Sequence, residues 1–146
     1  MRDVRGGQNS APPGQKAPRR LAADPNADVV WVALYTSDRI ARIDTRTNQV
    51  KEYVMPTAYA SPYALAVDKN GAVWINTMNH DVLTKFDPRT ERFTEYTLPT
   101  RGTEIRHVQI DNRTDPVTVW APYNRTNKVV RLQFLASTTQ QTRTGR

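Results

Sequence analysis

A repeat of 43 residues is the feature that most limits how this chain can fold. Residues 29–56 and 72–99 align without a gap, and nine of the 28 aligned positions are identical. The identical pairs are Val30/Val73, Trp31/Trp74, Asp38/Asp81, Asp44/Asp87, Arg46/Arg89, Thr47/Thr90, Glu52/Glu95, Tyr53/Tyr96 and Pro56/Pro99. In repeat proteins each copy is one structural unit that buries its apolar face against the next copy. We therefore expect an array of similar units.

The repeat extends beyond these two copies in both directions. Leu21–Asp24 resembles Leu65–Asp68, and Trp120 corresponds to Trp74 after a three-residue insertion. The third copy is partial, because no Glu-Tyr-x-x-Pro sequence follows it as it does in the other two. Residues 20–134 therefore hold about 2.7 repeats.

Short apolar or alternating segments alternate with turn signals inside each repeat. In the second copy these segments are Ala64–Val67, Val73–Asn76, Val82–Phe86 and Phe93–Leu98. The Asn70-Gly71 step between the first two supplies the positive φ that tight hairpins need. Four strands in roughly 43 residues are typical of a β-propeller blade, so the predicted fold class is all-β with four-stranded antiparallel blades. A coincidental duplication inside a β-sandwich is the alternative.

The predicted domain is an incomplete propeller. Its blades are expected at about 20–56, 62–99 and 105–134, and the Gly-, Pro-, Gln-, Thr- and Arg-rich tails 1–19 and 135–146 are expected to be disordered. Closed propellers have roughly four to eight blades. A shorter array exposes blade faces and edges, so we expect it to self-associate or to bind missing blades.

Composition excludes several classes of function. The formal net charge is +7, but four of these charges fall within residues 1–20 and two within residues 135–146. Any binding of nucleic acid would therefore be electrostatic and not sequence-specific. No run of 18 apolar residues could span a membrane, and residues 1–20 lack the apolar core of a signal peptide. The chain has no cysteine, which excludes disulfides and thiolate metal sites and leaves both the cytosol and the bacterial periplasm open.

Loops at one end of the propeller channel form the candidate ligand-binding site. Such loops precede each first strand or join each second and third strand, and concave sites built from loops commonly bind ligands. The candidate residues are Tyr63, Asn79, Glu104, Arg106, His107, Tyr123 and Asn124. The Glu104–His107 segment could hold a metal ion or an anion, or it could be an exposed ion pair beside a histidine of the channel wall.

Two other features have structural interpretations. Asp111–Asp115 carries several side-chain oxygens but lacks the glycine and the distant glutamate of a calcium-binding EF-hand loop, so a turn is predicted there and no metal site. Trp31, Trp74 and Trp120 recur once per repeat and are expected to pack between blades.

The repeat resembles the blades of the virginiamycin B lyase (streptogramin lyase) family. The likeness rests on Asp-x-x-Gly, x-Val-Trp, an apolar-x-Lys/Arg-apolar-Asp strand and Glu-Tyr-x-x-Pro, and it is clearest in residues 43–56 and 64–99. It implies the C-terminal part of a seven-bladed propeller from a bacterial protein of the periplasm or another extracytoplasmic compartment. It also implies a carbon–oxygen lyase that opens a cyclic depsipeptide ester by elimination, with magnesium as cofactor.

The resemblance places the family's catalytic residues at positions that differ in this chain. Histidines of Pro-His steps fall on Tyr63 and Arg106, and a glutamate that follows the blade tryptophan falls on Thr77. The predicted function is therefore a propeller segment that binds a small molecule or a partner and lacks streptogramin lyase activity. The alternative is a lyase-like or lactonase-like metal enzyme whose catalytic blades lie outside this chain, with magnesium bound in the full-length family member.

Overall fold

The computed structural model describes residues 16–134 and contains three antiparallel sheets. The first sheet has the order β1 (Pro18–Ala23), β2 (Val29–Leu34), β3 (Arg39–Asp44), β4 (Val50–Val54). The second has the order β5 (Pro62–Val67), β6 (Val73–Thr77), β7 (Val82–Asp87), β8 (Arg92–Thr97). The third contains β9 (Gln109–Asp111), β10 (Thr118–Tyr123) and β11 (Lys128–Leu132), with β10 in the middle. The prediction of an all-β propeller array is confirmed.

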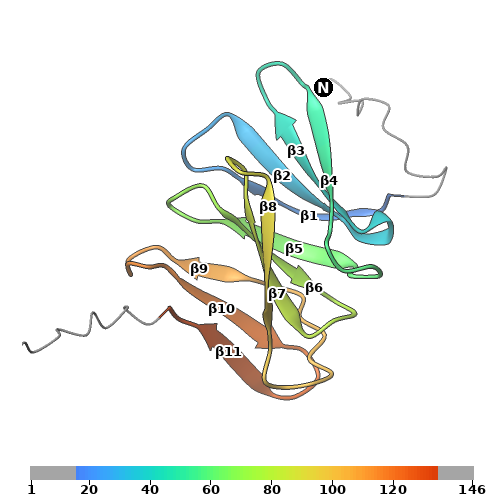
Figure 1. The fold of residues 1–146 in the computed structure, drawn as a ribbon, viewed down its shortest axis with the longest axis vertical. Coiled ribbons are helices and arrows are strands. Elements are labelled where there is room, and N and C mark those ends of the chain that lie inside the picture. Colours follow the sequence, from blue (N-terminus) through green and yellow to red (C-terminus); the bar gives the residue numbers. More distant parts are fainter. Residues whose placement is uncertain (1–15, 135–146) are drawn as a thin grey trace, which may run out of the picture.

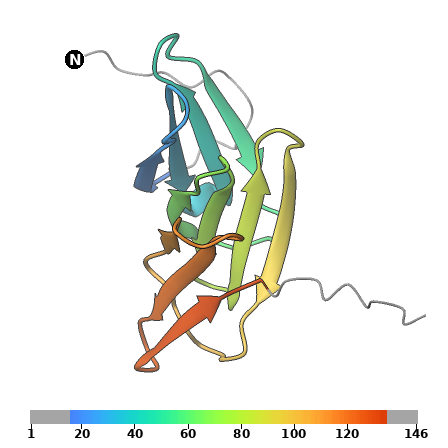
Figure 2. The same ribbon diagram turned by 90° about the vertical axis from the view of Figure 1, so that its left-hand side faces the viewer.

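The three sheets stack face to face in the order of the sequence (Figures 1 and 2). The first strands of the sheets are neighbours, since β1 contacts β5 and β5 contacts β9. These strands therefore line the inner side of the array, as expected for propeller blades. Within residues 16–134, the only helical element is the short 3₁₀ turn Tyr35–Ser37, and none is long and apolar enough to cross a membrane.

Two apolar clusters hold the sheets together. In the first, Trp31 of β2 packs edge-on against Phe86 of β7, with ring centroids 5.6 Å apart. In the second, Trp74 of β6 packs with Val119 of β10 and with Ile105, which lies in the loop before β9. Side chains alternate between the two faces of a strand, so the second sheet packs Trp74 against the third sheet and contacts Trp31 of the first sheet with its other face.

Trp120 corrects the expectation that all three tryptophans pack between blades. Its side chain is 38% exposed, whereas Trp31 and Trp74 are 1% and 0% exposed. Trp120 lies in β10 on the face of the third sheet that points away from the second, and no described residue forms a further sheet there.

The N-terminal boundary also differs from the prediction. β1 begins at Pro18, so Pro18 and Arg19 belong to the first sheet and not to the expected disordered tail of residues 1–19. The predicted disorder of residues 1–15 and 135–146 falls outside the described part of the chain.

Candidate functional site

Repeated aspartates fix the loops at one end of the array. The carboxylate of Asp38 accepts hydrogen bonds from the backbone N–H groups of Tyr59 and Ser61, at 2.7 and 2.9 Å. Its counterpart Asp81 accepts from the N–H groups of Gly102 and Thr103 at 3.0 and 2.9 Å, and from the Thr103 hydroxyl at 2.7 Å. Each aspartate thus ties a loop inside its own sheet to the loop that enters the next sheet.

Hydrogen bonding keeps Asp81 ionised. Burial alone would raise its pKa, but the bonds from Thr103 and Gly102 outweigh burial and hold the pKa below its usual range. Asp38 and Asp81 therefore build the loops, and their carboxylates are already occupied by donors.

Glu104 is the centre of a charge cluster among these loops. It has a positive φ of 48°, and its side chain accepts from Arg106 at 2.8 Å and also from Arg125. These two hydrogen bonds lower the pKa of Glu104, and the hydrogen bond to Glu104 raises the pKa of Arg106. A small cavity of about 210 Å³ lies next to the cluster, with walls that include Asn79, Asp81, Glu104 and Arg125.

Arginine and tyrosine side chains gather at the adjacent ends of the inner strands. Tyr35 and Tyr63 contact each other edge to face, with centroids 6.1 Å apart. The guanidinium of Arg19 lies 4.9 Å from the Tyr35 ring centroid and 5.9 Å from that of Tyr63, and Arg20 lies 5.8 Å from the Tyr63 centroid. Among residues 16–134, neither Arg19 nor Arg20 forms an ion pair with a carboxylate, whereas Arg106 and Arg125 share Glu104.

The structure places most of the predicted site residues at this end. Asn79 is exposed and donates to the Ser61 hydroxyl at 2.9 Å, and the exposed Asn124 donates its backbone N–H to the Thr103 carbonyl at 3.0 Å. Tyr63 is half-buried, and Arg106 and His107 are exposed. Tyr123 differs from the prediction: it is only 5% exposed because it faces inward and packs in the cluster between the second and third sheets.

The sequence analysis missed Arg19 and Arg20 of this cluster; Tyr35 and Arg125 lie in loops between second and third strands, which it assigned to the site, but it did not single them out. A signal for Arg19 was present, because extending the match of Leu21 with Leu65 back by three residues aligns Pro18-Arg19 with Pro62-Tyr63. The same step in the third sheet is Ile105-Arg106. The equivalent positions at or just before the first strand of each sheet are therefore occupied by Arg19, Tyr63 and Arg106.

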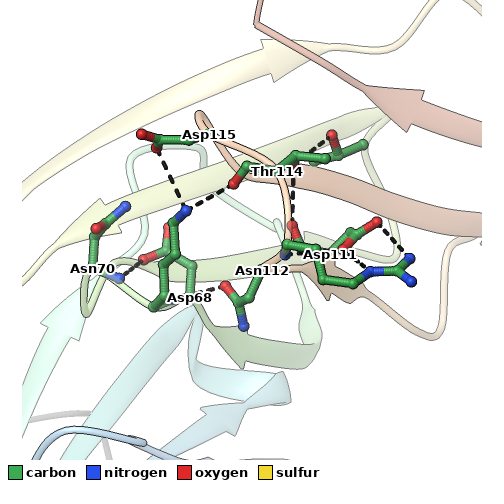
Figure 3. A network of polar contacts seen from close by, with 9 residues as sticks. Asp68, Asn70, Asp111, Asn112, Thr114 and Asp115 are labelled. Atoms are coloured by element: carbon green, nitrogen blue, oxygen red, sulfur yellow. Dashed lines mark hydrogen bonds and ion pairs between the residues drawn. The ribbon is translucent and has the colours of Figure 1, made fainter.

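The segment from Asp111 to Asp115 forms a turn at the opposite end of the array. The Asp111 carboxylate accepts from the backbone and the guanidinium of Arg113, which lowers the pKa of Asp111 from 3.8 to about 2. Figure 3 shows how this turn meets the turn of Asp68 and Asn70 in the neighbouring sheet. Lys69 donates its N–H to the Asn112 side chain and its ammonium group to the Thr114 carbonyl, both at 2.8 Å. The oxygens of this segment thus accept hydrogen bonds within the turn and from Lys69 of the neighbouring sheet.

Comparison with known proteins identifies the family. The sequence model of the virginiamycin B lyase family matches residues 7–143. The chain belongs to this family. No match in sequence is found among curated proteins.

Solved structures of the virginiamycin B lyase family share the fold. A streptogramin B lyase superposes with a TM-score of 0.68 at 17% identity, over 84% of this chain and 42% of that one. Selenomethionine-substituted virginiamycin B lyase from Staphylococcus aureus gives a TM-score of 0.68 at 16% identity, over 85% of this chain and 43% of that one. An auxiliary nutrient binding protein from Bacteroides ovatus gives 0.61 at 11% identity, over 80% and 34% of the two chains. The chain thus spans less than half the length of these proteins.

The residues at the family's catalytic positions do not fit a magnesium ion. A guanidinium such as that of Arg106 is a permanent cation with no lone pair to offer, and Mg²⁺ takes oxygen ligands in octahedral geometry. Thr77 is fully buried, and its hydroxyl donates to the His80 carbonyl at 2.7 Å. Within residues 16–134, no group of three His, Cys, Asp or Glu side chains is placed to hold a metal ion.

Proposed function

We propose that this propeller segment binds a small molecule carrying a carboxylate or phosphate group at the Arg19–Tyr63–Arg106 end of the inner strands. The observation that supports this most is the placement of Arg19 and Arg20 against two tyrosine rings without a carboxylate partner in the described chain. Guanidinium groups bind carboxylate and phosphate oxygens in pairs of hydrogen bonds. Tyrosine adds a hydroxyl donor and an apolar ring face for the rest of the ligand.

Titration calorimetry with inorganic phosphate and with benzoate tests this proposal. Arg19→Ala removes one cation from the cluster and should weaken binding at least about fivefold, since a charge-assisted hydrogen bond contributes about 1.5–3 kcal/mol. Arg46→Ala is the matched control, because Arg46 is 79% exposed at the other end of the array. Equal effects of the two substitutions, or no binding of either anion, would contradict the proposal.

We further propose that the chain does not open streptogramin B antibiotics. The elimination needs a base and a polarising group, and Tyr63, Thr77 and Arg106 supply a phenol, a buried hydroxyl and a permanent cation. A lyase-like or lactonase-like activity of a longer protein is the second candidate, and family membership favours it. Linear product from the purified chain in the presence of magnesium would refute the first proposal, whereas product formed only by the longer protein would support the second candidate.

Similar propellers support a location outside the cytoplasm. They include the extracellular domain of a putative one-component system from B. thetaiotaomicron and the nutrient binding protein from Bacteroides ovatus. We propose that the ligand is likewise taken from an extracytoplasmic compartment. Fractionation of cells that express the native gene tests this: recovery with cytosolic markers would contradict it.

A further inference from the structure

The three sheets share one backbone conformation just before their inner strands but differ in the side chain at that position. The residues are Ala17, Ser61 and Glu104, each two positions before the matched arginine or tyrosine, and their φ values are 39°, 50° and 48°. Left-handed backbone of this kind does not favour glutamate over other residues. The loop therefore does not require an acid, and only the third sheet carries a charge at this position.

The contact that this residue makes within its own sheet does not require a charge either. In the second sheet the Ser61 hydroxyl accepts from the Asn79 amide at 2.9 Å, which ties the start of β5 to the loop between β6 and β7. In the third sheet the counterpart of Asn79 is Arg125, which donates to the Glu104 carboxylate. An ion pair thus replaces a neutral hydrogen bond between equivalent loops.

Glu104 also compensates the charge of Arg106. One carboxylate oxygen of Glu104 accepts from Arg106 at 2.8 Å, and the other accepts from Arg125. These hydrogen bonds lower the pKa of Glu104, so the carboxylate is ionised at neutral pH. A guanidinium has five N–H donors, and the Arg106 side chain is 48% exposed, so part of it remains open to a ligand.

The two sides of Tyr63 consequently differ in charge. Its strand, β5, contacts β1 on one side and β9 on the other. On the β1 side Arg19 and Arg20 are exposed, and neither has a carboxylate partner among residues 16–134. On the β9 side the pKa of Arg106 is raised first by Glu104 and less by Tyr63, which is therefore near its guanidinium. One end of the cluster is cationic, and at the other end the guanidinium is paired.

We propose that Glu104 makes this site selective for a ligand with one negative charge. The anionic group binds at Arg19 and Arg20, and a neutral hydrogen-bond acceptor such as an amide carbonyl binds at Arg106. This inference rests on the proposed anion binding and specifies the class of ligand. A second carboxylate at Arg106 would compete with Glu104 for the guanidinium and would be repelled by its charge, whereas an amide oxygen accepts from the same N–H groups without that repulsion.

Titration calorimetry with terephthalate and with terephthalamate tests the proposal. The two are para-substituted benzoates of nearly equal size, and they differ in whether the far group is a carboxylate or an amide. The wild type should bind terephthalamate more tightly. Glu104→Gln should raise the affinity for terephthalate relative to terephthalamate about fivefold, because it removes a unit charge beside the far group at a site open to water. Glu95→Gln removes the same charge from an exposed position in β8 and should leave this ratio unchanged.

The direction of the change separates selectivity from a structural role. A variant that merely disturbed the loop would weaken the binding of both ligands, whereas Glu104→Gln should tighten the binding of terephthalate. Glu104→Ser, which introduces the side chain of the equivalent Ser61, should give the same shift. In the double variant Glu104→Gln with Arg106→Gln the gain should disappear, because the guanidinium that takes the second carboxylate is lost.

Two results would overturn the inference while the proposed anion binding stands. One is an unchanged ratio in Glu104→Gln, and the other is weaker binding of both ligands by this variant with an unchanged circular dichroism spectrum. A gain that persists in the double variant would likewise overturn it, because Arg106 would not be the group that Glu104 compensates. If the wild type bound neither ligand, the proposed anion binding and this inference would both be wrong.

Discussion

The loop-fixing aspartate Asp81 offers a direct test of how the sheets are joined. Asp81→Ala removes the acceptor of three hydrogen bonds, two from Thr103 and one from Gly102. Thr103 is 1% exposed, so its N–H and hydroxyl are left without a partner, whereas the exposed Gly102 can turn to water. An unsatisfied buried donor costs about 1–3 kcal/mol, so we expect a total loss of about 3 kcal/mol in the free energy of unfolding.

Two matched variants set the scale. Asp81→Asn keeps an oxygen that accepts from Thr103, but it loses the charge and places an NH₂ donor opposite the Gly102 N–H. This variant should therefore lower the free energy of unfolding by about 1 kcal/mol. Asp115→Ala removes a carboxylate whose side chain is 84% exposed and whose ion pair with Lys69 is 3.5 Å long. Exposed ion pairs contribute little, so this control should change stability by less than about 0.5 kcal/mol.

Urea denaturation followed by circular dichroism, at one fixed protein concentration, measures these differences. In thermal melts the Asp81→Ala change corresponds to a fall of about 12 °C, at about 4 °C per kcal/mol for a domain of this size. If Asp81→Ala were no less stable than Asp115→Ala, the aspartate would not hold the loops and the reasoning would be wrong.

Three further predictions concern buried polar groups and pH. In urea titrations Trp74→Phe should lower the free energy of unfolding by about 2 kcal/mol more than Trp31→Phe. The reason is that the Trp74 indole donates to Asp68 at 2.9 Å, whereas the Trp31 indole has no partner among residues 16–134. Equal decreases in the two variants would contradict this. Asn76→Leu should lower the free energy of unfolding by about 3 kcal/mol, because the buried Asn76 amide accepts from the Ala64 N–H and donates to the Ile105 carbonyl. Asn124→Leu, at an exposed position, is the control and should change the free energy of unfolding little. The pKa of Asp111 is lowered from 3.8 to about 2, so its contribution to stability is present above pH 3.8 and is lost as the pH falls toward 2. Melting temperatures should fall over that range, and less steeply in Asp111→Asn; identical slopes would show that Asp111 adds nothing.

Much of the fold could be predicted because the determining signals are local. Asn70-Gly71 lies in a tight turn of the structure, and Gly71 has the positive φ, +83°, that such a turn requires. Alternating apolar side chains specify which residues of each strand share a face, and a 43-residue period repeats that pattern sheet after sheet. Strands, their order and the family resemblance thus follow from residues close together in the chain.

The candidate site was only partly predictable, because its members meet through contacts between sheets. Arg19 precedes the repeat seen in the sequence, yet it lies against Tyr35 and Tyr63 once β1 pairs with β2. Tyr123 was expected at the channel mouth, but the register of β10 turns its side chain into the core.

The sequence by itself determined the repeating unit, its strands and its turns, because these depend on residues within a few positions of one another. Only the tertiary structure decided which side chains are buried. Trp31, Trp74 and Trp120 occupy the same place in the repeat, but Trp120 is exposed because burial depends on the sheet that packs against a strand, not on the strand itself. Tertiary contacts likewise decide that Asp81 accepts hydrogen bonds from the loop that leads to the third sheet, and that Glu104 pairs with two arginines.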